Sequence, residues 1–224
     1  MTRGIFIAGN ESALSRAIET EVLKRVERFT IALIPNRFSG TSKNSAAASE
    51  KRIALDWNPS SPISARTLVL AAENRMEHID EAILICSPPS IRSSAAELPL
   101  ADIEIMINDH IKGWFFLVKE LAAIFSSRQS GTLALVYSDI SGSAVHNKDD
   151  AADVLGPSSL ASFSALTSGL LTAAHREQYI TTGFSSSDTG NESAFAAFIF
   201  KYMDEINKRS KGKLYKFGKF KLFK

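Results

Sequence analysis

The chain has 224 residues, of which 45% are hydrophobic and 22% are charged, and its formal net charge is +2. These values are typical of a globular domain and exclude a disordered chain or a globally basic nucleic-acid binder. The single cysteine, Cys86, excludes an intramolecular disulfide and suits a reducing compartment. The first apolar run is too short for a secretion signal or a membrane span, so the sequence predicts a cytoplasmic protein.

Short apolar runs alternate along the chain with longer segments of helical period. The expected strands are 4–8, 30–34, 52–55, 82–86, 132–137, 179–183 and 213–217. The expected helices begin near residue 12 or cover 64–76, 102–126, 158–177 and 192–206. Such alternation is typical of βαβ units, whose strands are parallel. The sequence therefore predicts an α/β fold, a Rossmann-like doubly wound parallel sheet of about seven strands, in a single domain over residues 1–224.

Several motifs occur in an order and spacing that match one family. The first is AGNESALS at residues 8–15, followed by RAI, where that family ends its first strand with TGxxxGxG. The others are IDEAILICSPP (79–89), HIKGWF (110–115), GTLALVYS (131–138), FSALTSGLL (163–171) and GKLYKFG (212–218). Together they resemble the short-chain dehydrogenase/reductase family along the whole chain. The resemblance implies a nicotinamide cofactor and an oxidoreductase ancestry.

The resemblance places the family's catalytic Asn, Ser, Tyr and Lys on His110, Ser138, Phe163 and Thr167. Only the serine is retained. In the family the tyrosine exchanges a proton with the substrate and the lysine lowers the tyrosine pKa, which Phe and Thr cannot do. Because general acid–base catalysis contributes about 10²–10⁴ in rate, we expect a pseudoenzyme without the classical activity. The alternative is an active NADP-dependent oxidoreductase whose atypical catalytic residues are His110 and Ser138.

The dinucleotide turn keeps one of its three glycines, Gly9. Ala13 and Ser15 stand at the other two positions, where the family lets the cofactor's pyrophosphate approach the backbone. Glu11 adds a negative charge to the same turn. We therefore expect weak or absent cofactor binding.

Three further positions match cofactor contacts of the family. Arg37, after the second expected strand, resembles the arginine that meets the 2′-phosphate in NADP-preferring members, and Asp56 matches an acid that contacts adenine. Cys86 ends a central strand that faces the cofactor in the family, but we expect it to be a small buried hydrophobe rather than a reactive thiol. If a dinucleotide binds, the resemblance favours NADP over NAD.

Two other family features are missing or altered. The Pro-Gly after the sixth strand is absent from GFSSSDTG at residues 183–190, and the segment that covers the substrate in the family is nearly absent.

The four histidines have no metal-ligand spacing, so we expect no metal site. The resemblance implies a homo-oligomer formed through helices 102–126 and 158–177.

The segment 208–224 carries eight Lys or Arg and no acid, and because the whole chain carries +2, residues 1–207 carry −6. Alternating apolar and basic residues from 213 onward indicate a last strand with one buried face and a solvated basic edge. An alternative is a binding patch for nucleic acid or an anionic membrane. The sequence favours a binding or structural protein over an enzyme and identifies no substrate.

Overall fold

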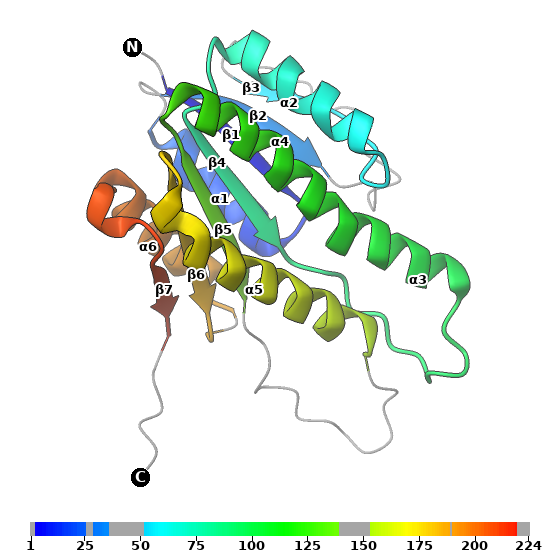
Figure 1. Ribbon diagram of the computed structural model, residues 1–224. Helices are drawn as coiled ribbons and strands as arrows, with labels where there is room; N and C mark the ends of the chain where they lie inside the picture. Colours follow the sequence, from blue (N-terminus) through cyan, green and yellow to red (C-terminus); the bar gives the residue numbers. More distant parts are fainter. Residues whose placement is uncertain (1–2, 26–28, 36–51, 139–152, 189, 219–224) are drawn as a thin grey trace.

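The computed structural model describes residues 3–25, 29–35, 52–138, 153–188 and 190–218. Within these ranges the chain forms one parallel sheet of seven strands in the order β3-β2-β1-β4-β5-β6-β7 (Figure 1). The strands are β1 (Arg3–Gly9), β2 (Phe29–Pro35), β3 (Arg52–Ala54), β4 (Glu81–Cys86), β5 (Thr132–Ser138), β6 (Ile180–Ser186) and β7 (Leu214–Phe217). The predicted α/β sheet in a single domain is therefore confirmed.

Helices cover both faces of the sheet (Figure 1). They are α1 (Ala13–Leu23), α2 (Pro62–Met76), α3 (Leu100–Ile107), α4 (Gly113–Arg128), α5 (Leu155–Ala173) and α6 (Glu192–Asp204). Helices α2, α4 and α5 pack on one face, and α1 and α6 pack on the other. None of the helices in the described part of the chain is long and apolar enough to cross a bilayer.

Two apolar cores follow from the alternation of side chains along each strand. Phe6 and Ala8 of β1 pack toward α2 and α4, whereas Ile5 and Ile7 pack toward α1 and α6. All six residues of β4 are buried, as expected for a central strand covered on both faces. The strands that supply side chains to both cores include apolar runs that the sequence predicted as strands.

The expected helix 102–126 is interrupted. A π-helical turn, η1 (Asn108–Lys112), lies between α3 and α4, so that the three pieces together cover 100–128. The expected helix 158–177 corresponds to α5 and the 3₁₀ turn η2 (Ala174–Arg176). A π turn inserts one residue into the helical repeat and is frequent at functional sites. The hydrophobic period continues through it, which is why the sequence did not reveal it.

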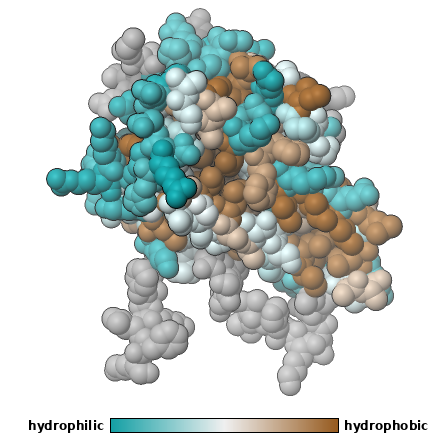
Figure 2. Space-filling view, in the orientation of Figure 1, coloured by the Kyte–Doolittle hydropathy of each residue, from teal (hydrophilic) through white to brown (hydrophobic). Residues whose placement is uncertain are grey.

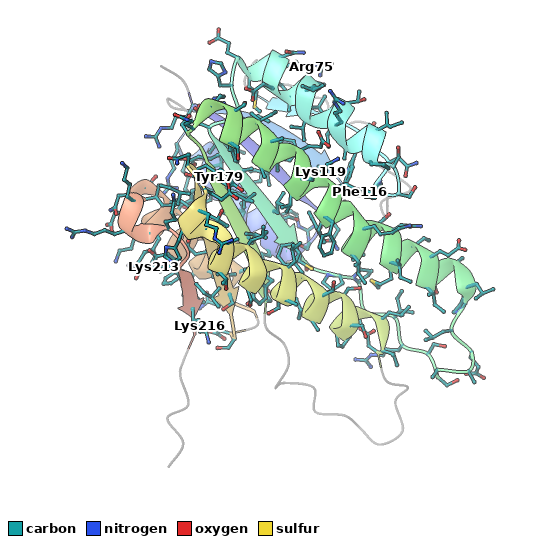
Figure 3. The ribbon with its side chains drawn as sticks, viewed as in Figure 1. Arg75, Phe116, Lys119, Tyr179, Lys213 and Lys216 are labelled. Carbon is teal, nitrogen blue, oxygen red and sulfur yellow. The ribbon has the colours of Figure 1, made fainter. Side chains whose placement is uncertain are left out.

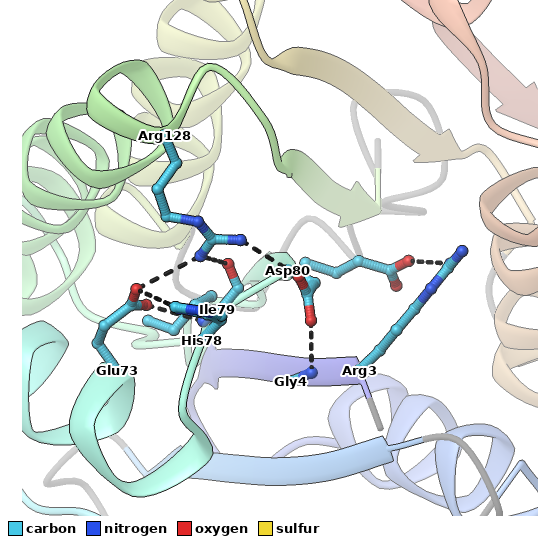
Figure 4. Close-up of polar contacts among 8 residues, drawn as sticks. Arg3, Gly4, Glu73, His78, Ile79, Asp80 and Arg128 are labelled. Carbon is cyan, nitrogen blue, oxygen red and sulfur yellow. Dashed lines mark hydrogen bonds and ion pairs between the residues drawn. The ribbon is translucent and has the colours of Figure 1, made fainter. Parts of the chain in front are cut away.

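A network of ion pairs and hydrogen bonds fixes the amino-terminal edge of the sheet (Figure 4). The Arg128 guanidinium contacts the carboxylates of Glu73 (3.3 Å) and Asp80 (3.2 Å) and donates to the carbonyl oxygen of Ile79 (2.9 Å). The other oxygen of Asp80 accepts from the N–H of Gly4 (2.9 Å). These contacts join α2, α4, β4 and β1 at the edge of the sheet opposite the carboxyl ends of its strands.

Candidate functional site

The carboxyl ends of β1, β4 and β5 meet at one edge of the sheet (Figure 1). The strand order reverses there, because β1 pairs with β2 on one side and with β4 on the other. In open parallel sheets such a switch point forms the crevice in which ligands bind. Gly9, Cys86 and Ser138 end these three strands. Three of the predicted site residues therefore lie at this edge.

The turn from β1 into α1 is closed by two serines. The Ser12 hydroxyl accepts a hydrogen bond from the N–H of Ser15 (3.1 Å), and the Ser15 hydroxyl accepts one from the N–H of Ser12 (2.8 Å). The Ser15 hydroxyl also donates to the carbonyl oxygen of Asn10 (2.9 Å). A helix N-terminus binds a phosphate through unpaired N–H groups. Two N–H groups at this end are already satisfied within the chain.

Gly9 and Asn10 hold β1 against β4. A Cβ on Gly9 would lie 3.0 Å from both the Cβ and the carbonyl oxygen of Ile85, so the close approach of the strands leaves little room for a side chain here. Asn10 is only 7% exposed, and its Nδ2 donates to the carbonyl oxygen of Ser87. This hydrogen bond joins the turn after β1 to the turn after β4, directly across the switch point.

Two exposed residues complete the turn. Ala13 presents a methyl group at the first residue of α1, where the family has glycine. The carboxylate of Glu11 lies 3.7 Å from the Arg16 guanidinium, and both side chains are largely exposed. A methyl group and an acid thus stand in the stretch that would have to accept the phosphates.

The segment after β3, where the resemblance places an adenine contact, has one feature that the sequence did not point to. Asp56 is exposed after β3, as an adenine contact would require, but the next residue, Trp57, is 6% exposed. A Cβ on Gly113 would lie 3.1 Å from the Trp57 ring, so the indole packs on the first turn of α4. Arg37 lies outside the described residues. Only Asp56 of these two predicted contacts can therefore be placed.

Phe163 and Thr167 are part of the core. Phe163 is 1% exposed, and its ring lies edge-on to Trp114 (5.4 Å between centroids) and to Tyr137 (6.1 Å). Thr167 is also 1% exposed, and its hydroxyl donates to the carbonyl oxygen of Phe163 (2.8 Å). The two residues that the resemblance places at the family's proton donor and cation are therefore a packed ring and a hydroxyl bonded to its own helix.

His110 and Ser138 lie in different surroundings. His110 is fully buried in η1, and burial lowers its pKa to about 4, so its imidazole is neutral at physiological pH. Ser138 is half-buried at the end of β5, where it pairs with Ser186 of β6. A buried neutral imidazole suits a structural role, and a base with so low a pKa holds a proton poorly at pH 7.

Tyr137 is the residue that sequence analysis missed. It is 5% exposed, and its hydroxyl lies 3.3 Å from the Ser164 hydroxyl on α5. This phenol is close to Phe163, which the resemblance places at the family's tyrosine. The signal was present in the alternation of β5, since Leu133, Leu135 and Tyr137 all face the layer of α4 and α5.

Cys86 is fully buried at the end of β4. Burial raises the pKa of its thiol far above the ordinary range, so the thiolate is not formed near neutral pH. The predicted buried, inert thiol is the interpretation that this geometry favours over a reactive one.

The connection from β6 to α6 is short, as the sequence predicted. Five residues separate Ser186 from Glu192. The Ser186 hydroxyl accepts from the N–H of Asp188 (3.1 Å), and the N–H of Ser187 donates to the carbonyl oxygen of Phe217 at the end of β7 (3.0 Å). The turn is thus bonded to the neighbouring strand and contains no segment that could cover the crevice. Among the described residues, no three His, Cys, Asp or Glu side chains are grouped as metal ligands.

The chain is similar to known proteins in structure but not in sequence. No family model matches the sequence, and no curated protein matches it. Among solved structures, ElxO with NADP bound has a TM-score of 0.75 at 14% identity, covering 96% of this chain and 97% of that chain. NADH-dependent reductase A1-R′ complexed with NAD has a TM-score of 0.75 at 11% identity, covering 96% and 95%.

A short-chain dehydrogenase/reductase from Serratia marcescens is similar over the same extent, with a TM-score of 0.65 at 15% identity, covering 96% of this chain and 95% of that chain. In each of these comparisons the likeness covers nearly the whole chain. The chain has the fold of the short-chain dehydrogenases/reductases.

Proposed function

We propose that this chain is a degenerate member of the short-chain dehydrogenase/reductase family that has lost hydride transfer and serves as a binding or structural protein. The observation that carries the proposal is the burial of Phe163 between Trp114 and Tyr137. The ring at the position that the resemblance gives to the proton donor has no hydroxyl group. Because it is packed in the core, it also has no surface with which to contact a substrate. The short β6–α6 turn supports the same conclusion. A reductase needs a segment that covers the substrate and excludes water, and this turn is too short to supply one.

The β1–α1 turn fits a dinucleotide poorly. Its N–H groups at Ser12 and Ser15 are used within the chain, and the Asn10 side chain bridges the switch point. We expect weak or absent binding of NADP and NAD, with no saturation of NADPH fluorescence or of calorimetric heat in the micromolar range. An Ala13→Gly, Ser15→Gly double variant should bind NADPH better than the parent. A low-micromolar dissociation constant for the parent would contradict this part of the proposal.

Turnover decides the main point. The purified protein, with NADPH and a broad panel of carbonyl compounds, should show no reduction above background. The Phe163→Tyr, Thr167→Lys pair should remain inactive, because the cofactor turn has changed as well. Robust turnover by the parent would overturn the proposal.

The alternative, an active NADP-dependent oxidoreductase with atypical residues, has one observation in its favour. Ser138 is retained and half-exposed at the end of β5. His110 is a weaker candidate in this alternative, because it is fully buried. Turnover abolished by Ser138→Ala but not by His110→Ala would support the alternative and would assign the chemistry to the serine.

A homo-oligomer is the assembly that the helix surfaces suit. Leu100, Ile107 and Phe115, from α3 and α4, are 79%, 42% and 50% exposed, and Figure 2 shows a continuous brown area over α3. On α5, a Cβ at Gly169 would have nothing within 4 Å, so a second helix could approach closely. Such apolar patches are typical of interfaces. We expect a dimer in light scattering that Ile107→Glu weakens, whereas Leu70→Glu on exposed α2 leaves it unchanged.

A further inference from the structure

The last strand and the turns beside it form a basic surface at the edge of the sheet. Its exposed cations are Arg176 of η2, Lys208 and Arg209 of η3 (Lys208–Ser210), Lys213, and Lys216 of β7. None of them forms an ion pair with an acid in the described ranges. We call these five residues the basic ledge. Figure 3 shows Lys213 and Lys216 along β7 at the edge of the molecule.

Backbone contacts hold the parts of the ledge together. The N–H of Gly212 donates to the carbonyl oxygen of Thr181 (2.8 Å), and Lys211 donates its ammonium to the carbonyl oxygen of Glu177. A Cβ on Gly212 would lie 3.7 Å from the His175 ring, so η2 lies beside the turn that enters β7. The cations are therefore presented by a folded surface rather than by a free tail.

The aromatic residues of β7 do not belong to the ledge. The Tyr215 ring packs against Phe184 (5.4 Å between centroids) and Tyr202 (4.3 Å), and the Phe217 ring packs against Phe195 (5.5 Å). Proteins that bind single-stranded nucleic acid stack bases on exposed aromatic rings. These two rings instead attach β7 to β6 and α6, so that within residues 213–218 the exposed side chains are those of Lys213 and Lys216.

The chemistry of the cations points to a diffuse anionic surface. Three of the five ledge cations, Lys208, Lys213 and Lys216, are Lys. Lys is a flexible point charge, whereas the planar fork of Arg is the preferred group for bidentate recognition of phosphates in nucleic acids. Lysines on an edge strand also disfavour pairing with the edge of a second copy. A cluster of four to eight basic residues is typical of proteins that bind anionic lipids.

The distribution of charge along the chain favours such binding. Residues 208–224 carry +8 and residues 1–207 carry −6, so the positive charge is concentrated in the segment that contains four of the five ledge residues. An anionic bilayer attracts these cations. We propose that the basic ledge docks this protein on membranes rich in anionic phospholipids. This inference goes beyond the proposed loss of hydride transfer and does not depend on it.

The test is co-sedimentation of the full chain with phosphatidylcholine vesicles with and without phosphatidylserine. Binding should require phosphatidylserine and should disappear in about 1 M salt, where the screening length falls to about 3 Å. Each basic residue near an anionic membrane contributes about fivefold in affinity. The Lys213→Gln, Lys216→Gln pair should therefore bind about 25-fold more weakly.

A matched control separates the ledge from net charge. The Arg75→Gln, Lys119→Gln pair removes the same two charges from exposed positions on α2 and α4 (Figure 3), and its vesicle binding should equal that of the parent. Equal losses in both pairs, or no binding to phosphatidylserine, would overturn the proposal. Tighter binding to duplex or single-stranded oligonucleotides at the same salt, lost in the ledge pair, would also overturn it and assign the surface to nucleic acid.

Discussion

The two edges of the sheet differ in how they treat polar groups. At the amino-terminal edge, Arg128, Glu73 and Asp80 form a network between four elements (Figure 4). At the carboxyl edge, where this fold places its chemistry, the hydroxyls of Ser12, Ser15 and Thr167 bond to neighbours within the same turn or helix. Functional sites commonly carry polar groups that find a hydrogen-bond partner only when a ligand binds. Here the three hydroxyls named at the carboxyl edge contribute to stability instead, and the predictions below test how the two edges differ.

The largest effect should come from the carboxyl edge. Phe163→Ala removes a fully buried ring from between Trp114 and Tyr137, and such truncations cost about 4 kcal/mol in the free energy of unfolding. Chemical denaturation measures the loss. Phe115→Ala, at a half-exposed position on α4, is the control and should cost far less. A small loss at Phe163 would mean that the site is loosely packed and still able to admit a ligand.

The next effect lies at the amino-terminal edge. Arg128→Ala leaves the carboxylates of Glu73 and Asp80 and the carbonyl of Ile79 without their shared donor, at a cost of about 3 kcal/mol. Arg16→Ala removes an exposed arginine whose ion pair with Glu11 spans 3.7 Å, and such pairs contribute about 0.5 kcal/mol. If both variants unfold at the same denaturant concentration, the two edges do not differ as described.

The sequence predicted the fold better than the site. Apolar runs such as 82–86 and 132–137 must be buried on both faces, and the helical segments between them force parallel strands, so the layers follow from local pattern. The strand order was not predicted, because nothing in the composition of β1 distinguishes β4 from β3 as its neighbour.

The content of the site depends on contacts between distant segments. Trp57 packs on Gly113, which lies 56 positions later in the chain. Asn10 bonds to Ser87, which lies 77 positions later. The π turn around His110 has no sequence signal, because the apolar period continues through it. The substitutions at Phe163 and Thr167 were visible in the sequence, but their burial as core residues was not.

A pH titration should reveal an intermediate effect at the amino-terminal edge. Glu81 is 5% exposed, and its burial raises its pKa to about 7 although Arg3 lies 3.1 Å away. The folded state therefore binds this proton more tightly than the unfolded state, whose pKa is near 4.5. The resulting stabilisation is complete below pH 4.5 and is lost as the pH rises through 7, by about 3 kcal/mol.

Glu81→Gln should remove this part of the pH dependence. The difference in unfolding free energy between parent and variant should change steadily from pH 4.5 to 7 and stay constant above it. Because all other groups are shared, the difference isolates Glu81. Parallel stability curves across that range would show that Glu81 titrates normally and that this edge is more open to water than its packing indicates.

The smallest effect returns to the carboxyl edge and concerns the turn that replaces the dinucleotide loop. Ser15→Ala removes the acceptor of the Ser12 N–H and the donor to the Asn10 carbonyl, and the loss of such a capping interaction costs about 1 kcal/mol. Ser168→Ala on α5 removes an exposed hydroxyl that only bonds back to Ser164 within its own helix, and it should be neutral or slightly stabilising because Ala is the better helix former. Thermal unfolding of the two variants beside the parent measures the contrast. A stable Ser15→Ala protein would mean that the Ser12 N–H finds water at no cost, and that this end of α1 remains open to an anion.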